Sequence, residues 1–195
     1  MNDPILEKHC WAEINLDALR HNFAFIKRTI GGPVCAVVKA DAYGHGDIVV
    51  ARVLQEEGAA AFAVSCLAEA KRLRRHDVNV PVLILGYADP SEAAALAQED
   101  IATACFSTEY AKALSAAAVA AGVKVKVHLK IDTGMGRIGF AAQSGWQAVV
   151  QELESLYRLP GLDICGIFQH FAVADSLEPD AQTYTDHQYA LFRKV

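Results

Sequence analysis

The sequence predicts an α/β fold in which parallel strands are covered by helices. Six short apolar runs, at residues 34–40, 61–66, 81–86, 101–106, 123–132 and 162–171, alternate with stretches of helical period. Most of these runs are almost continuously apolar, which is typical of parallel strands buried on both faces. Because the strand–helix pair recurs about every 20–35 residues, we expect consecutive βα units in one parallel sheet.

The predicted helices follow from apolar spacing and from their end signals. Asp17 could cap a helix that runs to about Ile30, and the pair Gly31-Gly32 would then stop it. Ser91, after a proline, is a plausible start for another helix. The helical stretches cover residues 46–57, 67–76, 91–98, 108–121 and 144–157.

Two parallel architectures fit this pattern: a doubly wound open sheet and the eight-stranded (β/α)8 TIM-type barrel. In the barrel, reactive residues sit at the carboxyl ends of the strands. Lys39, Asp132 and His170 each lie at the end of a predicted strand, which favours the barrel. Only about six βα units can be counted, so we expect an incomplete barrel. We expect a single domain over residues 1–195, because no linker-like segment interrupts the chain.

Composition narrows the class of protein. The chain has 195 residues, is 53% hydrophobic and carries 18 basic against 23 acidic residues, a net charge of −5. A sizeable core is therefore possible, and the acidic balance makes nucleic acid an unexpected partner. No apolar stretch approaches the roughly 18 residues of a membrane helix, and residues 1–7 have no signal-peptide pattern. With five widely spaced cysteines, these features predict a cytoplasmic protein.

The segment 36–46 (AVVKADAYGHG) contains the least ordinary residue of the chain, a lysine at the end of an apolar strand. Lys39 could simply extend its amine out of the strand mouth into water. Alternatively, a partly desolvated amine has a lowered pKa and becomes a nucleophile able to form a Schiff base. Tyr43, four residues on, offers a phenol at the same rim.

A second polar segment follows the fifth predicted strand. Gly134, Gly136 and Gly139 match the dinucleotide pattern G-x-G-x-x-G. That pattern belongs in the first βα turn and needs an acidic residue at the end of the next strand, so we expect no NAD site. A glycine-rich loop that presents Arg137 is the better interpretation.

One face of the fifth predicted strand carries charge. His128, Lys130 and Asp132 alternate along it and would point into a barrel. A structural ion-pair cluster is one explanation of these residues. His170 could likewise be an ordinary core residue or could stack against a planar cofactor. We expect no metal site, because none of these residues shows close ligand spacing.

Together these segments resemble the alanine racemase family, which depends on pyridoxal phosphate. The stretches 36–46, 130–137 (KIDTGMGR) and 170–175 (HFAVAD) resemble three segments of that family in the same order, and 11–17 (WAEINLD) resembles its opening segment. The resemblance runs over essentially the whole chain. It implies racemisation of alanine, which supplies D-alanine for cell-wall peptidoglycan.

The resemblance also implies roles for individual residues. Lys39 would form the internal aldimine with pyridoxal 5'-phosphate and act as acid and base on one face of the substrate. Tyr43 would bind the cofactor phosphate, and His170 would lie beside the ring. The remaining cofactor-lining residues would be Val37 and Leu85.

Two further expectations concern the fifth strand and the rest of the enzyme. Arg137 would contact the substrate, and Lys130 matches a position that is carbamylated in some members. The family's C-terminal β-rich domain supplies a second base across a homodimer, and it is absent from these 195 residues. We therefore expect the chain alone to be an inactive, truncated N-terminal portion. The alternative function is a pyridoxal-phosphate-binding barrel that handles the cofactor without racemase activity.

Overall fold

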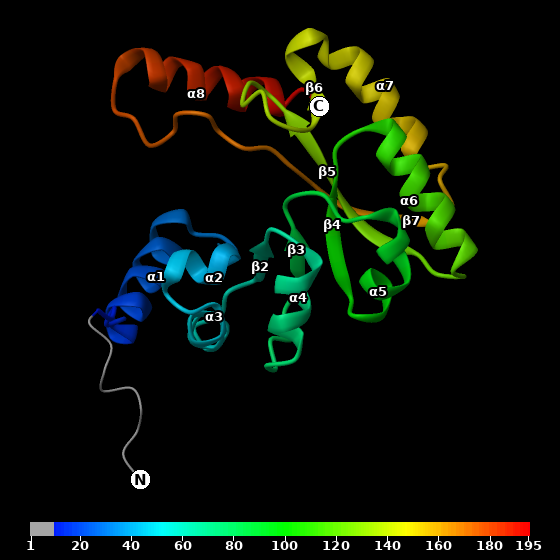
Figure 1. Ribbon diagram of the computed structural model, residues 1–195. Coiled ribbons are helices and arrows are strands. Elements are labelled where there is room, and N and C mark those ends of the chain that lie inside the picture. The colour runs from blue at the N-terminus through cyan, green and yellow to red at the C-terminus, as the bar shows by residue number, and fades with distance from the viewer. Residues whose placement is uncertain (1–9) are drawn as a thin grey trace.

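The computed structural model describes residues 10–195, so the expectation made for residues 1–7 lies outside the described part. Its centre is a sheet of seven parallel strands in the order β1-β2-β3-β4-β5-β6, with β7 also pairing with β5 (Figure 1). The strands are β1 (Cys35–Val37), β2 (Ala61–Val64), β3 (Val82–Ile84), β4 (Ile101–Cys105), β5 (Val125–Asp132), β6 (Phe140–Ala141) and β7 (Leu162–Phe168).

Helices lie between most successive strands, with α1 before β1 and α8 after β7 (Figure 1). They are α1 (Leu16–Ile30), α2 (Lys39–Gly44), α3 (Asp47–Glu56), α4 (Leu67–Arg74), α5 (Ala93–Gln98), α6 (Thr108–Ala120), α7 (Trp146–Leu156) and α8 (Pro179–Phe192), with 3-10 turns η2 (Pro90–Glu92) and η3 (Ala142–Ser144). Within residues 10–195, no helix combines the length and apolar character needed to cross a bilayer.

The strand order decides between the two architectures. Strands β1 to β5 are neighbours in chain order, and β7 takes the place beside β5. In a doubly wound sheet the order of the strands reverses at a switch point, whereas in this sheet the order does not reverse. Since parallel crossovers are right-handed, an unreversed order places the crossover helices on one side, as in a βα barrel. The barrel class is confirmed, with six main strands as predicted and β6 as an additional two-residue strand.

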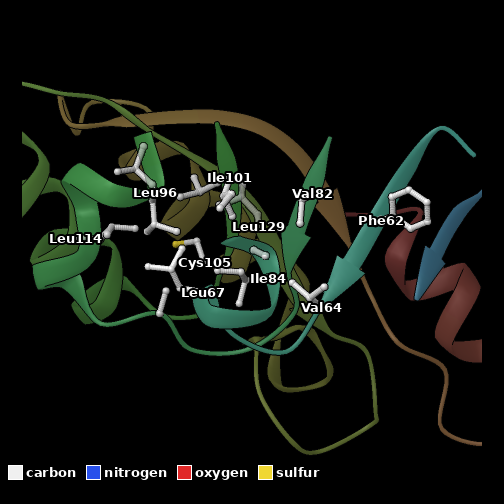
Figure 2. Close-up of a cluster of buried hydrophobic side chains, with 14 of the residues drawn as sticks. Phe62, Val64, Leu67, Val82, Ile84, Leu96, Ile101, Cys105, Leu114 and Leu129 are labelled. Carbon is white, nitrogen blue, oxygen red and sulfur yellow. The ribbon is translucent and has the colours of Figure 1, made fainter. Parts of the chain in front are cut away.

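The core fills the space between the sheet and its helices. Figure 2 shows side chains from β2, β3 and β4 meeting those of the covering helices. Phe62, Ile84 and Ile101 on the strands, and Leu96 and Leu114 on the helices, are each at most 1% exposed. All five residues of β4 are buried, as the continuous apolar pattern predicted. This packing holds the carboxyl ends of the strands at one edge.

Two predicted helix starts are wrong by a few residues. The N-cap of α1 is Asn15, whose side chain accepts a hydrogen bond from the Ala18 N–H, while Asp17 lies inside the first turn. Asp89, not Ser91, begins the next helical segment, because it forms a reciprocal capping box with Glu92. In both cases a polar residue two positions earlier in the chain captures the free amide. The predicted stop at Gly31 is confirmed, with φ +65°.

The corrected cap of α1 is testable by two substitutions. Asn15→Ala should lower the free energy of unfolding by about 1 kcal/mol, because it leaves a first-turn amide without its acceptor. Asp17→Ala should cost less, about 0.3–0.5 kcal/mol, since it removes only a favourable charge near the helix N-terminus. Urea unfolding of both variants measures the difference. An Asp17→Ala loss larger than that of Asn15→Ala would restore the original assignment.

Candidate functional site

The segment that carries Lys39 has an unusual backbone. Strand β1 ends at Val37, so Lys39 does not close the strand as predicted but begins α2. From Ala40 to Tyr43 the φ angles lie between +51° and +56°, which makes α2 a left-handed turn. Each L-residue in this conformation costs roughly 1–2 kcal/mol, and non-glycine residues usually adopt it singly. Four in succession require strong support from the surroundings.

This turn places the lysine and the phenol side by side. The Lys39 ammonium nitrogen lies 5.9 Å from the centre of the Tyr43 ring. Tyr43 is 62% exposed, and Lys39 is half-buried. The residues are four apart, so one turn of either hand brings their side chains to the same side. The predicted pairing of amine and phenol at one rim is therefore present.

The glycine-rich loop between β5 and β6 is organised by Asp132. Its Oδ1 accepts hydrogen bonds from the N–H groups of Gly134 at 2.9 Å and Gly136 at 3.1 Å. Burial acts to raise the pKa of Asp132, but these hydrogen bonds and the charge of Lys130 outweigh it and lower the pKa. Asp132 thus holds the loop that presents Arg137.

Lys130 is buried beneath this loop, with 3% of its surface exposed. Its Nζ donates to the backbone oxygen of Ile131 at 3.0 Å and lies 5.4 Å from the centre of the Phe168 ring. Burial lowers the pKa of Lys130, and the Arg137 charge lowers it further against the opposing effect of Asp132. In the described part of the chain, no carboxylate lies within 4.0 Å of this amine. The ion-pair cluster considered from the sequence is not formed there.

The His170 segment is tied to α8 by a buried glutamine. His170 lies two residues beyond the end of β7. The Gln188 amide nitrogen donates to the Thr133 hydroxyl at 3.2 Å and to the His170 carbonyl at 3.4 Å. Its oxygen accepts from the Ala172 N–H at 3.0 Å, and the side chain is fully buried. One residue of α8 therefore joins the glycine-rich loop to the histidine loop.

Tyr184 makes a second link from the same helix. Its hydroxyl donates to the Gly134 carbonyl at 2.8 Å. Sequence reasoning missed both Tyr184 and Gln188. Their four-residue spacing on a helix that directly follows the histidine loop was the only available signal.

The predicted site residues meet in one cavity of about 410 Å³. Of the seven residues predicted, only Lys130 is outside its lining. The cavity is lined by Val37, Lys39, Tyr43, Ser65, Leu85, Gly86, Arg137, Ile138, Phe168, Gln169 and His170. Among these described lining residues there is no carboxylate, while Lys39 and Arg137 are cations. The cavity is therefore suited to an anionic ligand such as a phosphate ester.

The histidine in this cavity is held toward its neutral form. Burial lowers the pKa of His170, and the positive charges of Arg137, Lys130 and Lys39 lower it further. A neutral imidazole can either accept or donate a hydrogen bond, and its flat face can pack on an aromatic ring. His170 is not an ordinary core residue, which was one of the two interpretations from the sequence, because its side chain is exposed and lines the cavity.

The fold and site define a barrel-type α/β domain built around a lysine in a cationic cavity. Residues 14–195 match the family described as alanine racemase, N-terminal domain. The chain belongs to the alanine racemase family, which confirms the resemblance found in its motifs. It is 42% identical over 197 residues to an alanine racemase of Desulforamulus reducens, covering 100% of this chain and 50% of that protein.

Solved structures agree with this assignment. An alanine racemase of Clostridium difficile 630 superposes with a TM-score of 0.84 at 37% identity, covering 94% of this chain and 48% of that one. A histidine racemase of Leuconostoc mesenteroides superposes with a TM-score of 0.83 at 32% identity, covering 98% and 50%. The chain thus spans about half the length of the relatives it matches.

Two glycines of the Arg137 loop provide a matched test of its geometry. At Gly139, with φ +126°, an added Cβ would lie 2.8 Å from the Lys130 carbonyl oxygen and from the Asp132 nitrogen. At Gly136, with φ +69°, an added Cβ meets nothing within 4 Å. Gly139→Ala should therefore destabilise the protein by about 3 kcal/mol, and Gly136→Ala by about 1 kcal/mol. Thermal unfolding measures both, and equal losses would contradict this packing.

Proposed function

We propose that the protein carrying this chain is a pyridoxal-phosphate-dependent racemase that interconverts L- and D-alanine. The observation that carries the proposal is the convergence of Lys39, Tyr43, Arg137 and His170 on one cavity without a carboxylate. An amine able to bond covalently to an aldehyde thus stands among groups that attract a phosphate. Family membership supports the same reaction and the same cofactor.

The residues present fit pyridoxal phosphate. Lys39 would hold the cofactor covalently through its amine, and Tyr43 would donate its phenol hydrogen to the phosphate. The apolar walls Val37 and Leu85 would enclose the ring, with His170 beside it. When bound, the cofactor supplies a ring that spreads the negative charge left on the substrate when the Cα proton departs.

Proton movement would then depend on Lys39 and a second base. The Lys39 amine would take or return the Cα proton on one face of the substrate. Racemisation requires a second group on the opposite face. We propose that this group comes from a partner subunit, as the family resemblance implies, so that the working protein is a homodimer. Arg137 would orient the substrate and the groups around it.

Alanine is the substrate class that most of the named relatives support, and D-alanine for peptidoglycan is the proposed use in the cytoplasm. One neighbour is named a histidine racemase, so substrate choice belongs in the experiment. A barrel that only handles the cofactor would bind pyridoxal phosphate at Lys39 yet leave both amino acids unchanged.

Replacing the lysine tests the proposal directly. Lys39→Ala should remove the visible absorbance of lysine-bound cofactor and lower racemisation of L-alanine by at least about 10²–10⁴-fold. Borohydride treatment of the wild-type protein, expressed from its complete reading frame, should leave the cofactor attached to the peptide containing Lys39. Lys112→Ala, on the exposed side of α6, is the matched control and should behave as wild type. Attachment at Lys130 would refute the assignment.

We also propose that Lys130 is carbamylated. Its lowered pKa increases the fraction of neutral amine, which is the form that attacks carbon dioxide. The nitrogen adds to the carbon and releases one proton, which leaves a negatively charged carbamate near Arg137. The cation–cation repulsion beneath the loop would thereby become an attraction.

Carbon-13 bicarbonate distinguishes the two states of Lys130. The wild-type protein should show a labelled carbamate signal in its NMR spectrum, and Lys130→Gln should not. Lys112→Ala should retain the signal, because it removes an exposed lysine of α6 and leaves Lys130 in place. A wild-type spectrum free of the signal at saturating bicarbonate would mean that Lys130 acts as an unmodified amine.

A further inference from the structure

The left-handed turn that carries Lys39 is bound to the next βα unit by a glutamate. Glu69 lies in the first turn of α4, and its Oε1 accepts a hydrogen bond from the Ala40 N–H at 2.9 Å. Its Oε2 accepts from both the N–H and the hydroxyl of Ser65, each at 2.7 Å. Because Lys39 and Ser65 both line the cavity, this carboxylate joins two of its walls.

Bonds inside the turn do not tie it to the rest of the barrel. The Ala42 N–H donates to the Val38 carbonyl at 3.0 Å, and the Gly46 N–H donates to the Asp41 carbonyl at 2.9 Å. These bonds close the turn on itself. The contact from Ala40 to Glu69 instead spans 29 residues and fixes the first left-handed residue to another element.

Helix α4 makes a second contact further along the same segment. Arg72, three residues after Glu69, places Nη2 2.9 Å from Asp47 Oδ1 and 3.5 Å from Asp41 Oδ1. Asp41 Oδ1 in turn accepts a hydrogen bond from the Asp47 N–H at 3.0 Å. One face of α4 therefore contacts the beginning of the turn, at Ala40 and Asp41, and the start of α3, at Asp47.

Helix capping alone does not explain the position of Glu69. A glutamate at the third helical position commonly reaches back to an amide at the helix start, and the Ser65 contact resembles that use. It leaves one carboxylate oxygen free, which here is directed to Ala40. Burial acts to raise the pKa of Glu69, but hydrogen bonds from Ser65 and Ala40 and the Lys39 charge outweigh it, so the carboxylate stays ionised.

We propose that Glu69 is a positioning residue for Lys39: its carboxylate fixes the left-handed turn so that the amine is held in the cavity. Glu69 does not line the cavity and acts through the Ala40 amide. The inference rests on the proposed function for the role of Lys39, while the hydrogen bond itself can be tested without it.

The rate of amide hydrogen exchange at residues 39–44 measures directly how firmly the turn is held. In the protein expressed from its complete reading frame, Glu69→Ala should accelerate exchange at residues 39–44 by roughly ten- to hundredfold, the ratio expected when a hydrogen bond to a charged group is lost. Exchange in α6 should not change. Glu69→Gln keeps an acceptor for Ala40 but not for both Ser65 donors, so it should give a smaller acceleration. If Glu69→Ala folds poorly, Glu69→Gln tests the proposal in its place.

Glu109→Ala is the matched control, because Glu109 also lies in the first turn of a helix but is exposed and belongs to α6. It should leave residues 39–44 and the turnover of alanine unchanged. Glu69→Ala should lower kcat about tenfold or more while KM for alanine moves less than threefold, since the chemical step depends on the amine position. A merely structural role would lower the amount of active protein without accelerating exchange at the turn alone.

Two outcomes would overturn the proposal. One is unaltered exchange at residues 39–44 in Glu69→Ala, and the other is an equal acceleration in α6, which would signal general destabilisation. Failure of the proposed function is recognised separately, because it appears in the wild-type protein as the absence of borohydride-trapped cofactor on Lys39.

Discussion

Every wall of the cavity follows the carboxyl end of a parallel strand. Lys39 follows β1, Ser65 follows β2, and Gly86 follows β3, while Arg137 and His170 follow β5 and β7. In a parallel sheet that never reverses, all these ends lie at the same edge. The parallel strand order therefore brings residues more than 130 positions apart to one edge of the sheet. The site depends on this arrangement of the strands, which the apolar core on the helix side of the sheet maintains.

Much of this arrangement was predictable because it depends on patterns that are local in the sequence. Six strands appear as apolar runs, and the odd polar residues at their ends identify the edge that carries the site. Lys39, Tyr43, Val37, Leu85, Arg137 and His170 do share a cavity. The two-residue strand β6 was not predicted, because two residues are too few to show a pattern of apolar and polar positions.

The left-handed turn could not be predicted, and the reason is physical. The segment Ala40 to Tyr43 contains no glycine, so local preference argues against positive φ. The conformation is imposed by contacts from α4, above all those of Glu69 and Arg72, which lie about 30 residues away. Such tertiary support leaves no local signal in the sequence. Lys130 is similar, since its burial against Phe168 depends on the pairing of β5 with β7.

The cavity is positively charged because the nearby carboxylates accept hydrogen bonds outside it. Asp132 is close to Lys130 in sequence, yet its Oδ1 is engaged by the amides of the glycine-rich loop. Glu69 is near Lys39, but both of its oxygens accept hydrogen bonds behind the turn. Neither carboxylate lines the cavity, so its cations remain available to an anion. The same acidic groups that hold the loops in place thus leave the site positive.

The cavity is consequently bounded by two loop systems with separate supports. On the side of β1 and β2, helix α4 holds the Lys39 turn through Glu69 and Arg72. On the side of β5 and β7, helix α8 holds the Arg137 and His170 loops through Tyr184 and Gln188. A ligand bound between them would contact both systems at once. Because each loop is fixed from behind by a helix, the reactive side chains are held in position before any ligand arrives, and binding need not order them.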